Sequence, residues 1–198
     1  NDRVVPDRRH PRECQPRGGP TSSQPPFDNQ KIRQAALLAL SQEPVLATMM
    51  GDAKFYKPCG AIFGCGTPLA SEAGAETLVA KGDPERAKAL LKEAGYDNTP
   101  VVIMQPTDVS SLRAAGFNVD MQPMDWQTLV GRRASQSAPK EGGWNIFFTN
   151  WQIPEIAGPL NNVMLNGRGN EAWFGWRQDA EIEKLKQEFI AATTPEEQ

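Results

Sequence analysis

The stretch WNIFFTNW, residues 144–151, constrains the fold more than any other part of this sequence. It follows the Gly142-Gly143 break, ends three residues before Pro154 and consists mostly of aromatic and β-branched residues. A short apolar run between such breakers is typical of a buried strand. Buried aromatic side chains usually fill a core, so a binding role for any of them needs an argument from its position.

Two further apolar runs, residues 101–105 and 117–121, also predict strands. A short helical pattern at residues 112–115 separates them, and Asp125 caps a helix that carries Trp126, Leu129 and Val130. The order strand, helix, strand, helix, strand predicts an α/β fold with a small, mostly parallel sheet flanked by helices in a three-layer arrangement.

The connection between the first two strands is short for a parallel crossover. Residues 106–116 supply eleven residues, whereas such a crossover usually takes a dozen or more. Two explanations are open. Either the strands are not simple parallel neighbours, or residues are missing between roughly Val109 and Leu112.

Helices are predicted on both sides of this region. Residues 29–40 and 42–50 form two joined helices, and Asp83-Pro84 starts a third one that Gly95 ends. A short helix is predicted at residues 159–165. Asp179 caps a last amphipathic helix, and we expect its apolar side chains to point inward: Ile182, Leu185, Phe189 and Ile190.

Residues 52–82 are rich in glycine and predict a long irregular loop, which in a compact domain is usually functional or disordered. Residues 1–26 hold five Arg and six Pro and predict an extended tail. Residues 194–197 open another helix that the sequence does not continue, so we expect a fragment whose globular part is residues 27–198.

Composition excludes several classes of function. The net charge is −3, which gives no electrostatic footprint for nucleic acid, and no apolar run approaches the roughly 18 residues of a membrane span. The one histidine, His10, lies in the tail, so mechanisms that need a His base or a His-rich metal site are disfavoured. We expect no metal, no cofactor and no catalytic residue.

The three cysteines leave one alternative function open. Cys59 and Cys65 share the irregular loop, while Cys14 is isolated in the tail. Their spacing matches no common zinc site, and the pair is equally compatible with a disulfide or with two free thiols. Free thiols in a flexible loop of an α/β domain would suit a thiol-dependent redox or transferase enzyme.

Four stretches in this order resemble the carboxyl-terminal lobe of the family 5 extracytoplasmic solute-binding proteins, which serve peptide, opine and nickel ABC transporters. They are PPFDNQKIRQAALLALSQEPVL, DPERAKALLKEAGY, GFNVDMQPMDWQTLVGRRASQ and GWNIFFTNW through WFGWRQDAEIEKL. The resemblance covers about residues 25–198 and leaves the first 24 unplaced. It implies the fold of a type II periplasmic binding protein, with a fuller helix where residues 110–115 stand here.

The resemblance also implies a function. Such a protein is a bacterial, periplasmic receptor that binds a small-molecule or peptide solute in a hinged cleft and passes it to ABC permease subunits. It would be a monomer, peripheral to the membrane, without enzymatic activity and without a nucleic-acid partner.

Candidate ligand-binding residues gather at the carboxyl end of the third strand, where open α/β sheets place their ligands. By the resemblance, Trp151 corresponds to a pocket tryptophan of the peptide receptors, flanked by Asn150, Thr149 and Phe148. Phe63 is a candidate for the rim of the cleft, although a surface loop stapled for stability is the simpler and favoured explanation. The chain departs from the family at Pro154, since peptide receptors often carry there an aspartate that holds the ligand's amino group.

Overall fold

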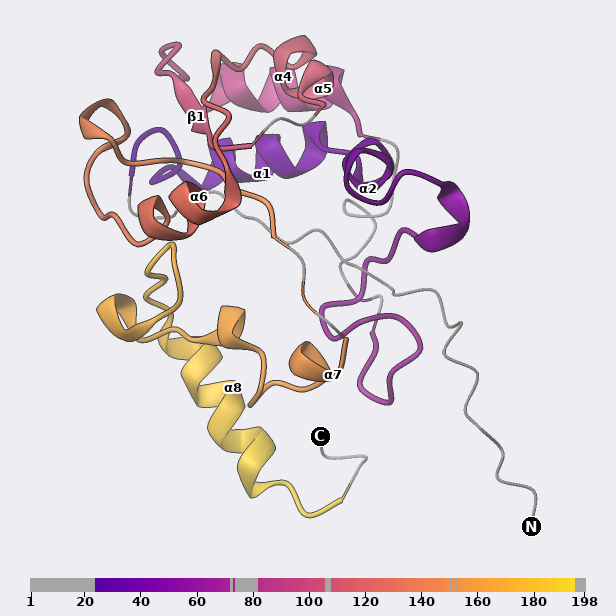
Figure 1. Ribbon diagram of the computed structural model, residues 1–198. Helices are drawn as coiled ribbons and strands as arrows, with labels where there is room; N and C mark the ends of the chain where they lie inside the picture. Colours follow the sequence, from indigo (N-terminus) through magenta and orange to yellow (C-terminus); the bar gives the residue numbers. More distant parts are fainter. Residues whose placement is uncertain are drawn as a thin grey trace.

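The computed structural model describes residues 24–71, 73, 82–105, 108–149, 151 and 153–194 (Figure 1). Most of the expected tail, the expected helix at residues 194–197 beyond its first residue and the candidate Asn150 therefore lie outside the described residues.

The sheet is small and parallel, as the sequence predicts. β1 (Val101–Ile103) pairs in parallel with β2 (Val119–Met121), with Val101 opposite Val119 and Ile103 opposite Met121. On the other edge of β1, Ile146 of the segment 144–149 forms a parallel bridge with Ile103. The predicted third strand is thus only partly formed, because the side chain of Asn145 takes the place of a backbone partner and accepts the Val102 N–H at 2.9 Å.

The short crossover is sufficient for strands of this length. α5 (Ser110–Ala114) lies between β1 and β2 and spans about 7 Å, close to the roughly 10 Å length of a three-residue strand. The alternative that these strands are not simple parallel neighbours is therefore wrong.

Side chains of β1 alternate between two cores. Val101 and Ile103 enter a cluster built with α1 (Gln30–Ala39), α4 (Pro84–Glu93) and α5, whereas Val102 and Met104 enter an aromatic cluster with Leu129 of α6 (Trp126–Arg132). Alternation is the consequence of the strand period of two. Helices therefore cover both faces of the sheet, and the α/β prediction is confirmed.

The helix starts follow local capping signals. The side chains of Asn29 and Asp83 accept backbone N–H groups from Lys31 and Arg86 at 2.9 Å, and Pro84 occupies the first turn of α4. α2 (Gln42–Met50) follows α1 after a two-residue break. The long loop begins with a single turn, η1 (Ala53–Phe55), and is otherwise irregular in its described part.

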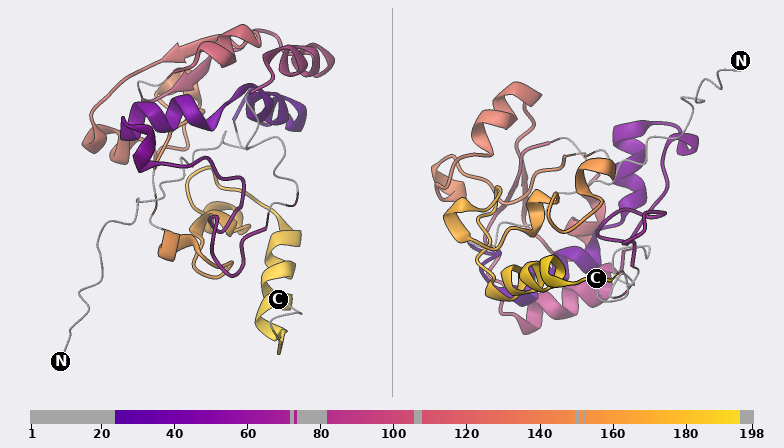
Figure 2. Two further views of the ribbon diagram at one scale, coloured as in Figure 1. Left: turned by 90° about the vertical axis from the view of Figure 1, so that its right-hand side faces the viewer. Right: turned by 90° about the horizontal axis from the view of Figure 1, so that it is seen from below.

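The carboxyl-terminal elements gather at the other end of the molecule from α4 and α5 (Figures 1 and 2). They are α7 (Ile153–Ile156), η3 (Val163–Leu165), η4 (Gly169–Glu171) and α8 (Ala180–Ala191). The short helix expected at residues 159–165 is reduced to η3, and α7 was not predicted. An antiparallel bridge between Arg168 and Gln178 closes a hairpin before α8.

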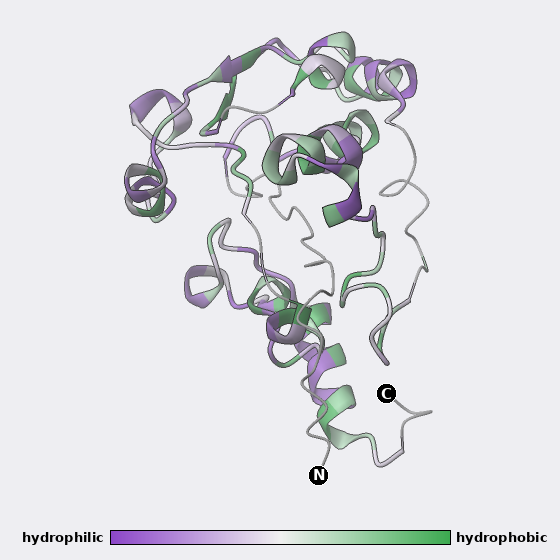
Figure 3. Cartoon of the chain, turned by 45° about the vertical axis from the view of Figure 1, so that its right-hand side comes forward, coloured by the Kyte–Doolittle hydropathy of each residue, from purple (hydrophilic) through white to green (hydrophobic). Residues whose placement is uncertain are grey.

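The apolar side chains of α8 were expected to point inward, and this expectation is wrong for two of them. Leu185 and Ile190 are 53% and 57% exposed, and no side chain of α8 is buried against the described part of the chain. Figure 3 shows apolar positions along this helix at the edge of the molecule. The spacing of apolar residues identifies the apolar face of a helix, but it does not establish that another element covers it.

Candidate ligand-binding site

The four described candidates differ in how far they are buried. Trp151 is half-buried, and so is Phe63, whereas Thr149 and Phe148 are each 5% exposed. Phe148 belongs to the core cluster shared by β1 and α1. Trp151 and Phe63 are therefore the candidates with the most surface available to a ligand.

Gln105 fixes the backbone just before Thr149 and Trp151. Its side-chain Nε2 donates to the Phe148 carbonyl at 2.5 Å, and its Oε1 accepts the Phe148 N–H. One amide thus replaces a strand residue and continues the pairing one step beyond Met104, whose N–H donates to the Ile146 carbonyl at 3.2 Å. This arrangement holds the carboxyl end of segment 144–149 at the edge of the sheet.

Trp151 has an indole N–H with no acceptor. The Nε1 atom is buried, and no described residue accepts a hydrogen bond from it. A buried donor without a partner costs free energy and calls for an explanation such as a ligand or a water molecule. The indole ring packs edge-on against Trp173, with the ring centroids 5.8 Å apart and the planes at 66°.

Trp173 joins Trp151 to an aromatic cluster on one face of β1. Phe147 stands at its centre, with its ring centroid 4.9 Å from that of Trp144 and 5.5 Å from that of Trp173. Phe174 and Trp176 complete the cluster. The sequence does not predict the contact of Trp173 with Trp151, because no local pattern relates two positions 22 residues apart.

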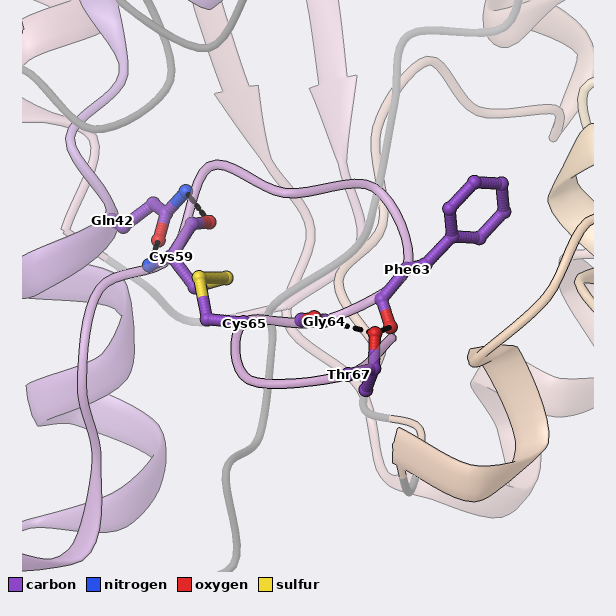
Figure 4. Close-up of a disulfide and its surroundings, with 6 residues drawn as sticks. All are labelled: Gln42, Cys59, Phe63, Gly64, Cys65 and Thr67. Atoms are coloured by element: carbon purple, nitrogen blue, oxygen red, sulfur yellow. Dashed lines mark hydrogen bonds between the residues drawn. A yellow bond between two sulfur atoms is a disulfide. The ribbon is translucent and has the colours of Figure 1, made fainter. Parts of the chain in front are cut away.

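The Phe63 loop is closed by a disulfide. Cys59 and Cys65 are joined, which decides between the two alternatives left open by the sequence. Gln42, the first residue of α2, holds the loop from outside: its Nε2 donates to the Cys59 carbonyl, and its Oε1 accepts the Cys59 N–H, both at 2.8 Å (Figure 4). Figure 4 also shows the Phe63 ring directed away from the disulfide.

The disulfide loop lies against α7. A Cβ atom built on Gly64 would be 3.2 Å from Cγ2 of Ile153, and one built on Gly158 would be 3.8 Å from Cδ1 of Leu69. Residues 63–69 therefore run beside residues 153–158, which follow Trp151 directly in the chain. The structure thus brings the segments that carry Phe63 and Trp151 together, as a shared site requires.

Two pockets lie elsewhere on the described part of the chain. One of about 440 Å³ is lined by Gln24, Gln136, Arg168, Gly169, Asn170, Glu171, Trp176 and Gln178. The other, of about 360 Å³, lies between the start of α1 and the end of α4. Neither includes a predicted site residue. Binding pockets bury most of a ligand's surface. Trp151 and Phe63 can therefore each contribute to the lining of a site, but the two side chains alone do not enclose a ligand.

Two helix-cap carboxylates have lowered pKa values. Hydrogen bonds from the Thr128 hydroxyl and backbone N–H lower the pKa of Asp125, and the Ile182 N–H is the main cause of a lowered pKa at Asp179. Among the described residues, no group of three or more His, Cys, Asp or Glu side chains could hold a metal ion, and no helix is long and apolar enough to cross a membrane.

Comparison with known proteins decides the family. Residues 14–172 match the family described as bacterial extracellular solute-binding proteins, family 5 Middle. The chain belongs to family 5 of the bacterial extracellular solute-binding proteins. The match begins at residue 14. Residues 14–24, which the resemblance left unplaced, therefore also have a counterpart in the family.

One relative and two solved structures show what this chain is similar to in sequence and in fold. A probable peptide ABC transporter periplasmic-binding protein of Sinorhizobium fredii is 34% identical over 185 residues, covering 88% of this chain and 35% of that protein. The substrate-binding protein CtaP of Listeria monocytogenes has a TM-score of 0.73 at 16% identity, over 95% of this chain and 39% of CtaP. OppA of Haemophilus influenzae in complex with RPPGFSPFR has a TM-score of 0.68 at 17% identity, over 94% and 38%.

The fold of this family 5 chain is therefore that of the type II periplasmic binding proteins, and the chain spans about a third of the length of its curated relative. The alternative of a thiol-dependent redox or transferase domain is not supported. The matched relatives are solute-binding proteins, and Cys59 and Cys65 are joined to each other.

Proposed function

We propose that this chain is the carboxyl-terminal lobe of the substrate-binding component of a bacterial ABC importer, and that its ligand is a peptide. Under this proposal the receptor works outside the cytoplasmic membrane as a monomer, without chemistry of its own, and delivers the solute to permease subunits. Residues 27–198 form the lobe. The 34% identical relative, a probable peptide ABC transporter periplasmic-binding protein, supports this ligand class.

One observation carries the assignment to this part of the chain. The Trp151 N–H is a buried donor without an acceptor at the carboxyl end of the sheet segment, beside Trp173 and next to the loop that carries Phe63. A peptide carbonyl would supply that acceptor, and aromatic rings would cover its side chains. Thr149 and Asn150 stand on the same segment as further polar contacts, and Phe148 supports them from the core.

The chain departs from the family at the residue that would hold the ligand's amino group, so the test compares peptides with a free and a blocked amino group. Under this proposal the chain belongs to a longer receptor, and calorimetric titration is done on that receptor with tripeptides in free and N-acetylated form. Because Pro154 stands where other peptide receptors often carry an aspartate, we expect acetylation to change the affinity by less than about ten-fold. Absence of heat with every peptide in the series contradicts the proposed function.

Trp151→Phe tests the role of the indole N–H. The variant keeps an aromatic ring but removes the donor, and we expect peptide affinity to fall about ten-fold, because an acceptor left without its donor costs more than 1 kcal/mol. Trp126→Phe is the matched control, since Trp126 lies more than half exposed on α6. Equal affinities of the two variants would exclude Trp151 as a ligand contact.

A further inference from the structure

The disulfide loop, residues 59–65, is held in place by three independent contacts. The Cys59–Cys65 bond closes it, the two hydrogen bonds of Gln42 tie Cys59 to the start of α2, and Gly64 lies against Ile153 of α7. Elements distant in sequence thus hold a loop of seven residues on both sides. The disulfide alone would close the loop, and the contacts with α2 and α7 fix its position in addition.

Within the loop, the backbone around residue 63 is fixed as well. The Thr67 hydroxyl donates to the carbonyls of Phe63 and Gly64 at 3.1 and 2.9 Å. Gly64 has a φ of +87°, which glycine adopts without strain, and its missing side chain allows the close approach to Ile153. The direction of the Phe63 side chain is therefore set by a rigid frame (Figure 4).

The two bulky apolar side chains of the loop lie in different surroundings. Ile62 is about half exposed, whereas Phe63 is partly covered, and its ring points away from the disulfide (Figure 4). An aromatic side chain has little conformational freedom to lose on binding, and fixing it in advance lowers the cost of binding further.

We propose that the Cys59–Cys65 disulfide is a positioning device for ligand binding: it presents Phe63 as the second wall of the site that contains Trp151. This inference rests on the proposed function. Opening the disulfide would remove one of the three contacts that hold the loop and would give residues 60–64 more conformational freedom, so part of the cost of ordering Phe63 would be met each time a peptide binds. We therefore expect the loss of affinity on opening the disulfide to depend on the Phe63 side chain and on no other side chain of the loop.

The test is a double-mutant cycle on the receptor that contains this chain, with Ala-Phe-Ala and its N-acetylated form as probes. We expect Phe63→Ala to weaken peptide binding about ten-fold and Cys59→Ser/Cys65→Ser to weaken it about five-fold. The decisive variant combines all three changes. Its affinity should equal that of Phe63→Ala alone, because freeing a loop that no longer contributes a contact costs nothing more.

Ile62→Ala is the matched control, since it removes an apolar side chain from the same loop at an exposed position; its affinity should stay within two-fold of the wild type. Thermal unfolding of every variant separates affinity from stability. If the disulfide variant is less stable but binds with wild-type affinity, the disulfide is only a staple and the inference is wrong. Additive losses in the triple variant also overturn it. If the wild-type receptor binds neither peptide, the proposed function fails instead.

Discussion

At the residue scale, Asn145 contributes most to joining separate parts of the chain. It is fully buried, its Oδ1 accepts the Val102 N–H at 2.9 Å and its Nδ2 donates to the Pro25 carbonyl at 3.0 Å. Asn145→Ala removes the side-chain amide and leaves the Val102 N–H and the Pro25 carbonyl without this partner. We expect the free energy of unfolding to fall by about 2–4 kcal/mol, because buried polar groups left unpaired cost about 1–3 kcal/mol each. Urea unfolding followed by tryptophan fluorescence measures the change.

Asn118→Ala serves as the control for this substitution. The Asn118 side chain donates at 3.0 Å to the Asn98 carbonyl in an exposed setting, so its removal should cost less than about 1 kcal/mol. Equal losses in the two variants would show that the burial of Asn145 does not determine its contribution.

The sequence predicted which residues are buried in the aromatic run, but it did not predict the long-range hydrogen bonds of Asn145. Residues 144–149 of the aromatic run were correctly expected to be buried, because the composition of the run and its flanking breakers are local signals. The pairing of Asn145 with Pro25 was not found, since it joins residues 120 positions apart. The binding role of Trp151, Thr149, Asn150, Phe148 and Phe63 stays a prediction for the titrations above.

At the element scale, α8 depends on its cap more than the buried helices do. Asp179 accepts the Ile182 N–H at 3.2 Å, and no side chain of α8 is fully buried. Asp179→Ala should lower the free energy of unfolding by about 1 kcal/mol near neutral pH, the usual cost of losing such a cap. Urea unfolding followed by circular dichroism in the helical region tests this.

The pH dependence of the Asp179 effect has a definite sign. Hydrogen bonding, first from the Ile182 N–H, lowers the pKa of Asp179 in the folded protein. Its stabilisation is therefore complete above the unfolded pKa of about 3.9 and is lost as the pH falls through the lower folded value. The gap between wild type and Asp179→Ala should close in that acidic range. Glu181→Ala, an exposed change in the same turn, should show no comparable gap.

Elements were predicted well where the signal was local. The starts of α1, α4, α6 and α8 coincide with their cap residues, since each cap bonds a backbone N–H two or three positions later. The third strand was overestimated, because Asn145 and Gln105 replace backbone pairing with side-chain hydrogen bonds. Nothing in residues 144–151 alone signals such a replacement.

At the scale of the whole molecule, the exposed face of α8 gives a contrasting prediction. Leu185→Gln together with Ile190→Gln keeps good helix-forming residues and removes side chains that are more than half exposed. The free energy of unfolding should therefore change by less than about 0.5 kcal/mol. Leu129→Ala, which empties a fully buried position in the aromatic cluster, should cost about 2–5 kcal/mol.

Urea unfolding of the two variants side by side distinguishes the cases. A loss of more than about 2 kcal/mol in the α8 double variant would mean that its apolar face is packed in solution. The overall α/β architecture could be predicted from the order of elements, whereas the coverage of α8 could not, because burial depends on which distant segments meet.

Gly64 leaves the protein little freedom to vary the spacing between the disulfide loop and α7. Any larger side chain there would meet Ile153 and would also have to adopt a left-handed backbone. Residue 63 is subject to neither restriction. Exchange of this single aromatic for leucine or tyrosine is therefore the change by which we expect a descendant of this sequence to acquire a new cargo preference while its scaffold stays as it is.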